Sequence, residues 1–359
     1  MRHRLFVFAF MCLASAAPCA AAELHLAPAG SMVVQQAVPL AFPGELPQLP
    51  RRVRQRVPAL TGLRSFRERV PVGTQTVYAQ AGNSIVQLVD FRKVVGLIQA
   101  PCSSGSLEGM KVDHDQNLWV VCSGSIEEFA PGDTAPSLTY VDNPDGDYYF
   151  IADVAIDSAG DVWASSLYGF SQSNEFEYGQ ISYWAAGSPS GSSPTGTISD
   201  PNIGYAYFID VDPAGRNVYV DYENIGFTGY DVDAIDGRKV ETFDQVVEPG
   251  GIYTSANGNV NVGDQNSASI TAFSRSTLRQ VAVYGPVCVH SVRGCILGDP
   301  IDVSFNPGDT ELLTDGLSTS DTGLVVGTNL DNRKHGDWKL HASVKLDLSG
   351  RGVFSPDDK

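Results

Sequence analysis

Three aspartates in this chain stand just ahead of short turn sequences and could act together chemically. Asp153 and Asp302 each lie four residues before the first polar residue of a turn, and Asp210 lies two residues before one. Carboxylate oxygens that converge on one point are suitable ligands for Ca²⁺ or another divalent metal. The same aspartates could instead bond turn amides or face water. A metal site is therefore one of two interpretations of this spacing.

Four cysteines lie beyond the N-terminal segment: Cys102, Cys122, Cys288 and Cys295. An even number of cysteines in an exported chain favours disulfides. Three pairings are possible, and we expect Cys102–Cys122 and Cys288–Cys295 because the members of each pair are close in the sequence. A zinc site is disfavoured because the Cys-x-x-Cys and Cys/His spacings that hold zinc are not present.

Residues 1–22 have the pattern of a cleavable signal peptide. Arg2 and Arg4 precede an apolar run from Leu5 to Ala17, and small residues suit cleavage after Ala22. The apolar run is too short for a membrane span, and no later stretch approaches the required length. We therefore expect a secreted or periplasmic protein with no transmembrane segment.

The charge of the chain excludes one class of partner and separates an N-terminal arm from the rest. The formal net charge is −17, which disfavours nucleic acid as a partner. Residues 23–72 are rich in proline and contain seven arginines between Arg51 and Arg69, with Glu68 as the one acid among them. From position 74 onward, 15 basic and 38 acidic residues give −23. The arm could lie on this acidic body or form a solvated linker.

Residues 73–350 repeat a strand–turn–strand pattern six times. The centres of the second strands are spaced by 41, 44, 56, 42 and 51 residues, and they are Tyr78, Trp119, Trp163, Tyr219, Asn261 and Leu312. Alternating apolar residues and glycine- or asparagine-containing turns indicate small antiparallel sheets. Units of this length predict an all-β fold, a six-bladed β-propeller with an extended N-terminal arm. The stretch Trp338–Leu348 is expected to pair with the first blade, and 351–359 to form a tail.

The repeats resemble those of known propeller groups. The pattern apolar-x-apolar-Asp-x-x-Gly-x-Leu/Val-Trp/Tyr-Val, best seen in Val154–Ala164 and Asn261–Phe273, is similar to NHL repeats and to SMP-30/gluconolactonase-like and streptogramin-lyase-like propellers. The resemblance covers about three quarters of the chain. SMP-30-like hydrolases hold a divalent metal with acidic and amide side chains, and their full ligand set has no match here.

The resemblance also points to one histidine. Streptogramin-lyase-like enzymes use a histidine as general base, and His290, in the loop before the sixth blade, is the best placed in this sequence. Aromatic residues at repeat positions suit blade packing better than glycan stacking, whereas the loop Ser171–Gly179 has the composition of a binding loop. We expect a non-catalytic binding or scaffold module for a protein or glycan. The alternative is a metal-dependent hydrolase or lyase with its site at the channel mouth.

Overall fold

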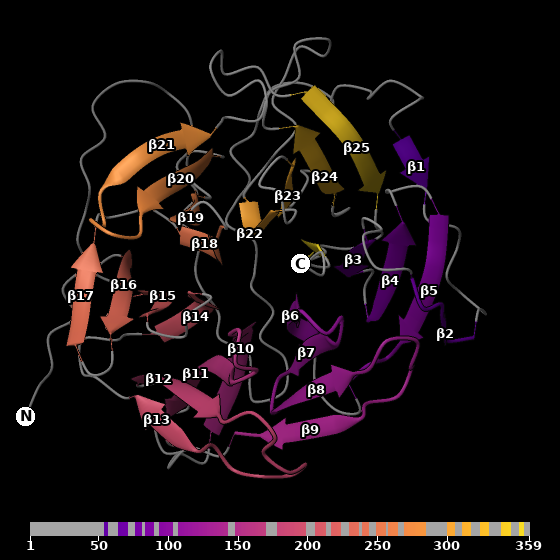
Figure 1. Cartoon of the computed structure of the whole chain (residues 1–359), viewed down its shortest axis with the longest axis horizontal. Helices are drawn as coiled ribbons and strands as arrows, with labels where there is room; N and C mark the ends of the chain where they lie inside the picture. Colours follow the sequence, from indigo (N-terminus) through magenta and orange to yellow (C-terminus); the bar gives the residue numbers. More distant parts are fainter. Residues whose placement is uncertain are drawn as a thin grey trace, which may run out of the picture.

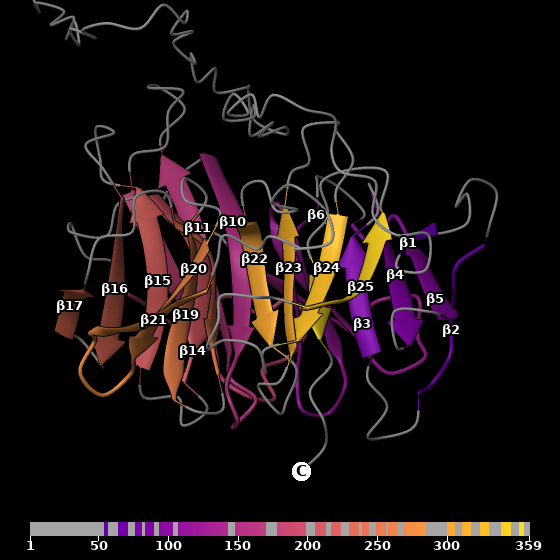
Figure 2. The ribbon, with the colours of Figure 1, turned by 90° about the horizontal axis from the view of Figure 1, so that it is seen from above.

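The structure is a computed structural model, and it describes the following residues: 54–56, 64–70, 76–80, 83–89, 93–102, 107–142, 148–169, 178–198, 205–212, 217–223, 230–236, 239–243, 249–255, 258–264, 269–284, 300–305, 311–316, 324–329, 339–345 and 352–354. All regular secondary structure in these ranges is β-strand. The strands form six sheets around a common axis, so the predicted all-β six-bladed β-propeller is confirmed (Figure 1). Seen side on, the sheets make a flat disc with their strands running through its thickness (Figure 2).

Four of the blades consist of four consecutive antiparallel strands. Blade 2 contains β6 (Leu107–Val112), β7 (Leu118–Cys122), β8 (Ser125–Phe129) and β9 (Leu138–Val141). Blade 3 contains β10 (Tyr148–Ile156), β11 (Val162–Gly169), β12 (Tyr178–Trp184) and β13 (Gly196–Ile198). Blade 4 contains β14 (Tyr205–Val211), β15 (Asn217–Glu223), β16 (Tyr230–Asp236) and β17 (Lys239–Phe243). Blade 5 contains β18 (Pro249–Thr254), β19 (Asn259–Asp264), β20 (Ser269–Ser274) and β21 (Gln280–Tyr284).

Blades 1 and 6 each have five strands, because they receive segments from elsewhere in the chain. Blade 1 contains β26 (Gly352–Phe354), β3 (Thr76–Gln80), β4 (Ser84–Val89), β5 (Lys93–Gln99) and β2 (Phe66–Arg67), in that order. Blade 6 contains β22 (Pro300–Phe305), β23 (Glu311–Gly316), β24 (Leu324–Asn329), β25 (Lys339–Lys345) and β1 (Arg54–Arg56).

The ring is closed by a strand other than the one that the sequence indicated. The expectation that 338–348 pairs with the first blade is wrong, because β25 pairs with β24 and β1 in blade 6. The closing strand is β26, which pairs antiparallel with β3 through Val353 and Tyr78. The apolar alternation of 338–348 fits an outer strand equally well, so the pattern alone did not distinguish the two places.

The core consists of layers between neighbouring blades. Between blades 2 and 3, Tyr140 stacks against both Trp119 and Trp184, with ring centroids 5.9 and 5.3 Å away. Similar apolar layers lie between blades 1 and 2, 3 and 4, and 4 and 5. A single sheet would leave both faces in water, so each blade depends on its neighbours to bury its apolar side chains.

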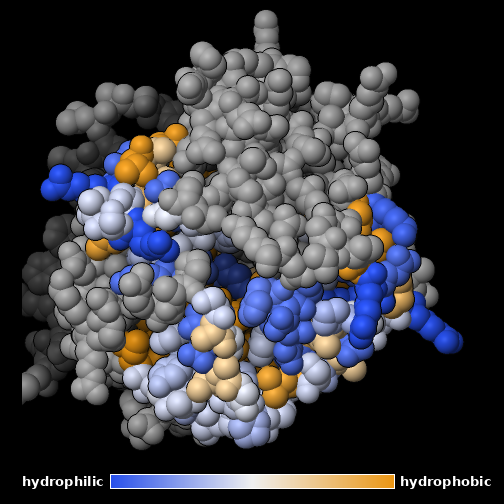
Figure 3. Space-filling model, viewed as in Figure 1, coloured by the Kyte–Doolittle hydropathy of each residue, from blue (hydrophilic) through white to orange (hydrophobic). Residues whose placement is uncertain are grey.

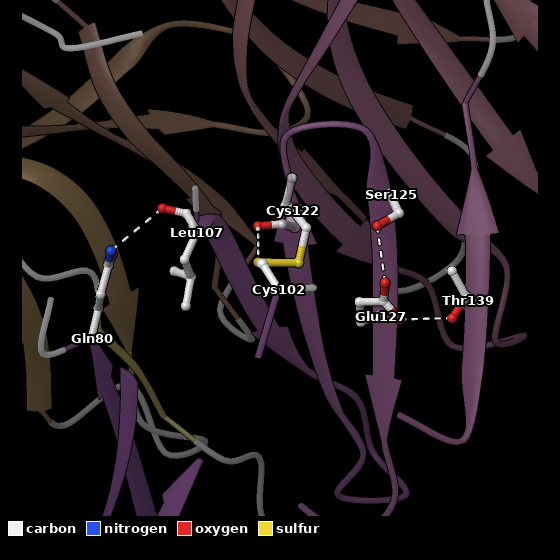
Figure 4. Close-up of a disulfide and its surroundings, with 8 residues drawn as sticks. Gln80, Cys102, Leu107, Cys122, Ser125, Glu127 and Thr139 are labelled. Atoms are coloured by element: carbon white, nitrogen blue, oxygen red, sulfur yellow. Dashed lines mark hydrogen bonds between the residues drawn. A yellow bond between two sulfur atoms is a disulfide. The ribbon is translucent and has the colours of Figure 1, made fainter. Parts of the chain in front are cut away.

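The predicted disulfide Cys102–Cys122 is present, with its Cα atoms 5.4 Å apart. It ties the segment after β5 to β7, and so joins blade 1 to blade 2 (Figure 4). Gln80 reinforces the same junction by donating to the Leu107 carbonyl at 3.4 Å. Cys288 and Cys295 lie outside the described residues. Within the described ranges there is no helix with the length and apolarity that a membrane crossing would need.

Candidate functional site

The inner strands line the axis, and those of blades 2 to 6 each have a bulge or irregularity near the same end. In blades 2 to 6 the pairing register shifts within β6, β10, β14, β18 and β22. Directly after this shift, Asp153 pairs with Ser165 and Asp302 pairs with Asp315. Counted from the turn, Asp153 and Asp302 occupy equivalent backbone positions in their strands. Asp210 lies two positions nearer its own turn, opposite Tyr219.

The carboxylates of Asp153 and Asp210 connect neighbouring blades. Asp153, which is buried, accepts a hydrogen bond from the Ile209 amide of blade 4 at 3.2 Å. Asp210, also buried, accepts one from the Thr254 amide of blade 5. In blades 3 and 4 the aspartate therefore accepts a hydrogen bond from a backbone amide in the inner strand of the next blade. The side chain of Asp302 lies outside the part of the chain that the structure describes.

Asp210 also faces a lysine that comes from two blades away. The Nζ atom of Lys111, on β6, lies 4.0 Å from the Asp210 Oδ1 atom, and both side chains are nearly buried. The same ammonium donates to the Ile252 carbonyl at 3.5 Å and lies 5.7 Å from the centre of the Tyr253 ring. Burial raises the pKa of Asp210, while Lys111 and the bonded amides oppose that rise. We call Lys111, Asp210 and Tyr253 the axial cluster.

The axial cluster does not fit a divalent metal. The Lys111 ammonium already lies beside the Asp210 carboxylate, where a metal cation would have to bind. Ca²⁺ and Mg²⁺ also require several oxygen ligands, and a lysine supplies none. Among the described residues, no three acidic, histidine or cysteine side chains are close enough to hold a metal ion. Metal binding that includes Asp153 and Asp302 stays a prediction. His290 lies outside the described residues, so its role stays a prediction as well.

The sequence did not reveal Lys111, although it carried a signal. Lys111 is the only lysine or arginine between positions 94 and 215, and it lies between the apolar residues Met110 and Val112 of an inner strand. A long cationic side chain in such a place needs a buried partner, because an unpaired buried charge is costly. Which blade supplies the partner depends on ring geometry and cannot be obtained from repeat spacing.

A second buried polar group joins blades 2 and 3. Asp142 follows β9, and its Oδ2 atom accepts hydrogen bonds from Ser166 at 2.6 Å and Ser182 at 3.0 Å. Gln180 donates to Ser182 at 2.9 Å. Both hydroxyls donate to one carboxylate oxygen, so this arrangement connects the end of β9 in blade 2 to β11 and β12 in blade 3.

Aspartates that begin the turns of blades 2 and 3 have a structural role. Asp113 accepts from the Asn117 amide at 2.8 Å and from the Trp119 indole at 2.8 Å. Asp157 accepts from the Asp161 amide at 3.0 Å and from the Trp163 indole at 3.4 Å. Each turn thereby secures the tryptophan of its own blade, and these aromatic residues serve blade packing.

Comparison with known proteins establishes the fold alone. No protein-family model matches the chain, and no curated protein matches its sequence. A chain in the crystal structure of a nidogen/laminin complex is similar, with a TM-score of 0.53 and 13% identity over 77% of this chain and 100% of that one. A protein of unknown function from Bacteroides caccae is also similar, with a TM-score of 0.54 and 10% sequence identity. The match covers 76% of this chain and 99% of that one. In total 812 solved chains match, so the fold by itself selects no activity.

Proposed function

We propose that this chain is an NHL-like β-propeller that acts outside the cytoplasm as a non-catalytic binding or scaffold module for a protein or glycan. The observation that carries the proposal is the use of the axial acids. Asp153 and Asp210 bond amides of the next blade, and Lys111 lies against Asp210. Groups that are committed to holding blades together are poorly available for acid–base or metal chemistry.

The disulfide supports the proposed location. Cys102–Cys122 links two blades, and disulfides of this structural kind persist in oxidising compartments. The signal-like N-terminus agrees with export. One structural neighbour comes from a complex of two proteins, nidogen and laminin. We take this neighbour as support for a protein over a glycan as the partner.

The described surface suits a recognition role distributed over several patches. Viewed down the axis, apolar patches alternate with polar ones around the described part of the ring (Figure 3). Among the large apolar side chains of the described residues, Phe66, Val141, Val281 and Val283 are exposed, and they lie on three outer strands, β2, β9 and β21. Within the described part of the chain, the exposed large apolar side chains thus lie on outer strands of blades.

Two measurements on the purified full chain test the proposal. The first is metal content with thermal unfolding in EDTA, Ca²⁺, Mg²⁺ and Zn²⁺, where we expect no bound metal and no shift. The second is binding to a displayed library of extracellular peptides and to a glycan array, where we expect saturable binding to one class. Stoichiometric metal that is lost in Asp153→Ala or Asp302→Ala would overturn the proposal in favour of the metal-dependent hydrolase or lyase.

A further inference from the structure

The outer edge of blade 1 carries an added strand on a blade that is already complete. Blades 2 to 5 have four strands each, and β26, β3, β4 and β5 give blade 1 the same number. The arm then adds β2, with Phe66 opposite Leu97 and Arg67 opposite Gly96. The Glu68 amide donates to the Val95 carbonyl at 2.7 Å, and Ser65 accepts from the Gln99 amide at 3.0 Å. Residues 65–69 therefore lie on the edge of β5 as an extended peptide would.

One side chain of this segment enters a slot between blades 1 and 2. The Arg67 guanidinium donates to the carbonyls of Phe129 and Ala130 at 3.1 and 2.9 Å, and to the Tyr78 hydroxyl at 2.7 Å. It also lies 5.1 Å from the centre of the Tyr78 ring. Carbonyl oxygens, a hydroxyl and an aromatic face together match the planar donors of an arginine. The slot thus binds the two terminal nitrogens of the guanidinium, while the Nε atom of Arg67 is buried with no hydrogen-bond partner.

Three residues next to the slot, Arg69, Gln87 and Gly96, extend it and shape it. Arg69 donates from Nε to the Pro131 carbonyl at 3.0 Å, so alternate residues of the segment both bind backbone of blade 2. Gln87 holds the Tyr78 hydroxyl from the other side at 2.9 Å. A Cβ atom on Gly96 would lie 2.6 Å from the Gln87 Oε1 atom and 3.3 Å from the Arg67 Cγ atom, so glycine is required there.

We propose that the edge of β5 and this slot form a strand-addition site for extended peptides that carry Arg-x-Arg, and that the chain's own residues 65–69 fill the site in cis. A partner protein would bind by presenting such a segment in place of the arm. The body beyond position 74 has a charge of −23, which favours a basic ligand. This inference rests on the proposed binding role and names the class of ligand for it.

The test uses the full chain and a labelled peptide of residues 62–71. Against wild type the peptide competes with a tethered copy at high effective concentration, so it binds weakly. In the Arg67→Ala, Arg69→Ala variant the tethered copy is weakened, and we expect at least roughly tenfold tighter binding. A matched peptide with both arginines replaced by lysine should bind no better to the variant than to wild type. Equal binding of the arginine peptide to both proteins would overturn the inference. So would binding of the lysine peptide to the variant as tightly as the arginine peptide binds it.

A second readout works without the variant. Excess peptide added to wild type should speed hydrogen exchange at the Glu68 amide of the chain while β5 stays protected. Unchanged exchange at saturating peptide would refute a displaceable strand. Adding Gly96→Ala to the double variant should abolish peptide binding. If the arginine peptide does not bind the Arg67→Ala, Arg69→Ala variant while another library member still binds, this inference fails and the proposed function stands.

Discussion

Lys111 and Asp210 come from inner strands two blades apart, and the Nζ and Oδ1 atoms lie 4.0 Å from each other at the axis. The pair draws blades 2 and 4 toward one point, and the Ile252 carbonyl brings in blade 5 through the same ammonium. The axis is therefore held by side chains from several blades, in addition to the sheets themselves.

Removing the ammonium should destabilise the whole ring. Lys111→Met leaves the Asp210 carboxylate buried beside no cation, and we expect a loss of about 3 kcal/mol in the free energy of unfolding. Urea denaturation measures it. Lys93→Met removes a lysine from the exposed pair with Glu68 and should change the value by less than about 1 kcal/mol. Similar losses in the two variants would contradict a stabilising axial pair.

The pH dependence of stability should carry the signature of Asp210. Its pKa is raised above the ordinary value of 3.8 in the folded protein, so the folded state binds a proton more tightly than the unfolded state does. The contribution of Asp210 therefore becomes less favourable as the pH rises from the unfolded pKa through the folded one. Asp210→Asn should remove this trend. Unfolding free energies of both proteins across that range check it, and parallel curves would refute it.

The turn aspartates offer a comparison within one turn. Asp113→Ala removes bonds to the Asn117 amide and the Trp119 indole, and should cost about 2 kcal/mol. Asp115→Ala lies two residues away on an exposed position and should stay within about 0.5 kcal/mol. Thermal unfolding of the two variants gives the difference directly. A larger effect at Asp115 would show that the repeat turns have been assigned incorrectly.

The disulfide between blades 1 and 2 should contribute measurably. Cys102→Ser with Cys122→Ser removes a cross-link over a sequence separation of 20 residues, and should cost about 3 kcal/mol. Peptide mapping without reduction should recover the Cys102–Cys122 pair from wild type. The same map tests Cys288–Cys295, and a crossed pairing between the two sets would contradict both expectations.

The sequence predicted the repeated parts of the fold better than the unique ones. Turn glycines, strands of alternating apolar and polar residues, and central aromatic residues such as Trp119 and Trp163 recur. They do so because each blade packs against its neighbours in the same way. Contacts made once per molecule have no repeat to reveal them. Arg67 in its slot is one such case, since the arm has little periodicity. Lys111 is another, because its partner lies roughly a hundred positions away in the chain.

The placement of β26 has a consequence for how a nascent chain matures. The edge of β3 is satisfied only when Gly352–Phe354 pair with it, although β3 itself is made nearly 280 residues earlier. Until Gly352–Phe354 have been synthesised, the first blade has an unpaired strand edge, which can pair with other molecules. A molecule that lacks Gly352–Phe354 would keep this unpaired edge of β3, and we expect it to aggregate more readily than the full chain.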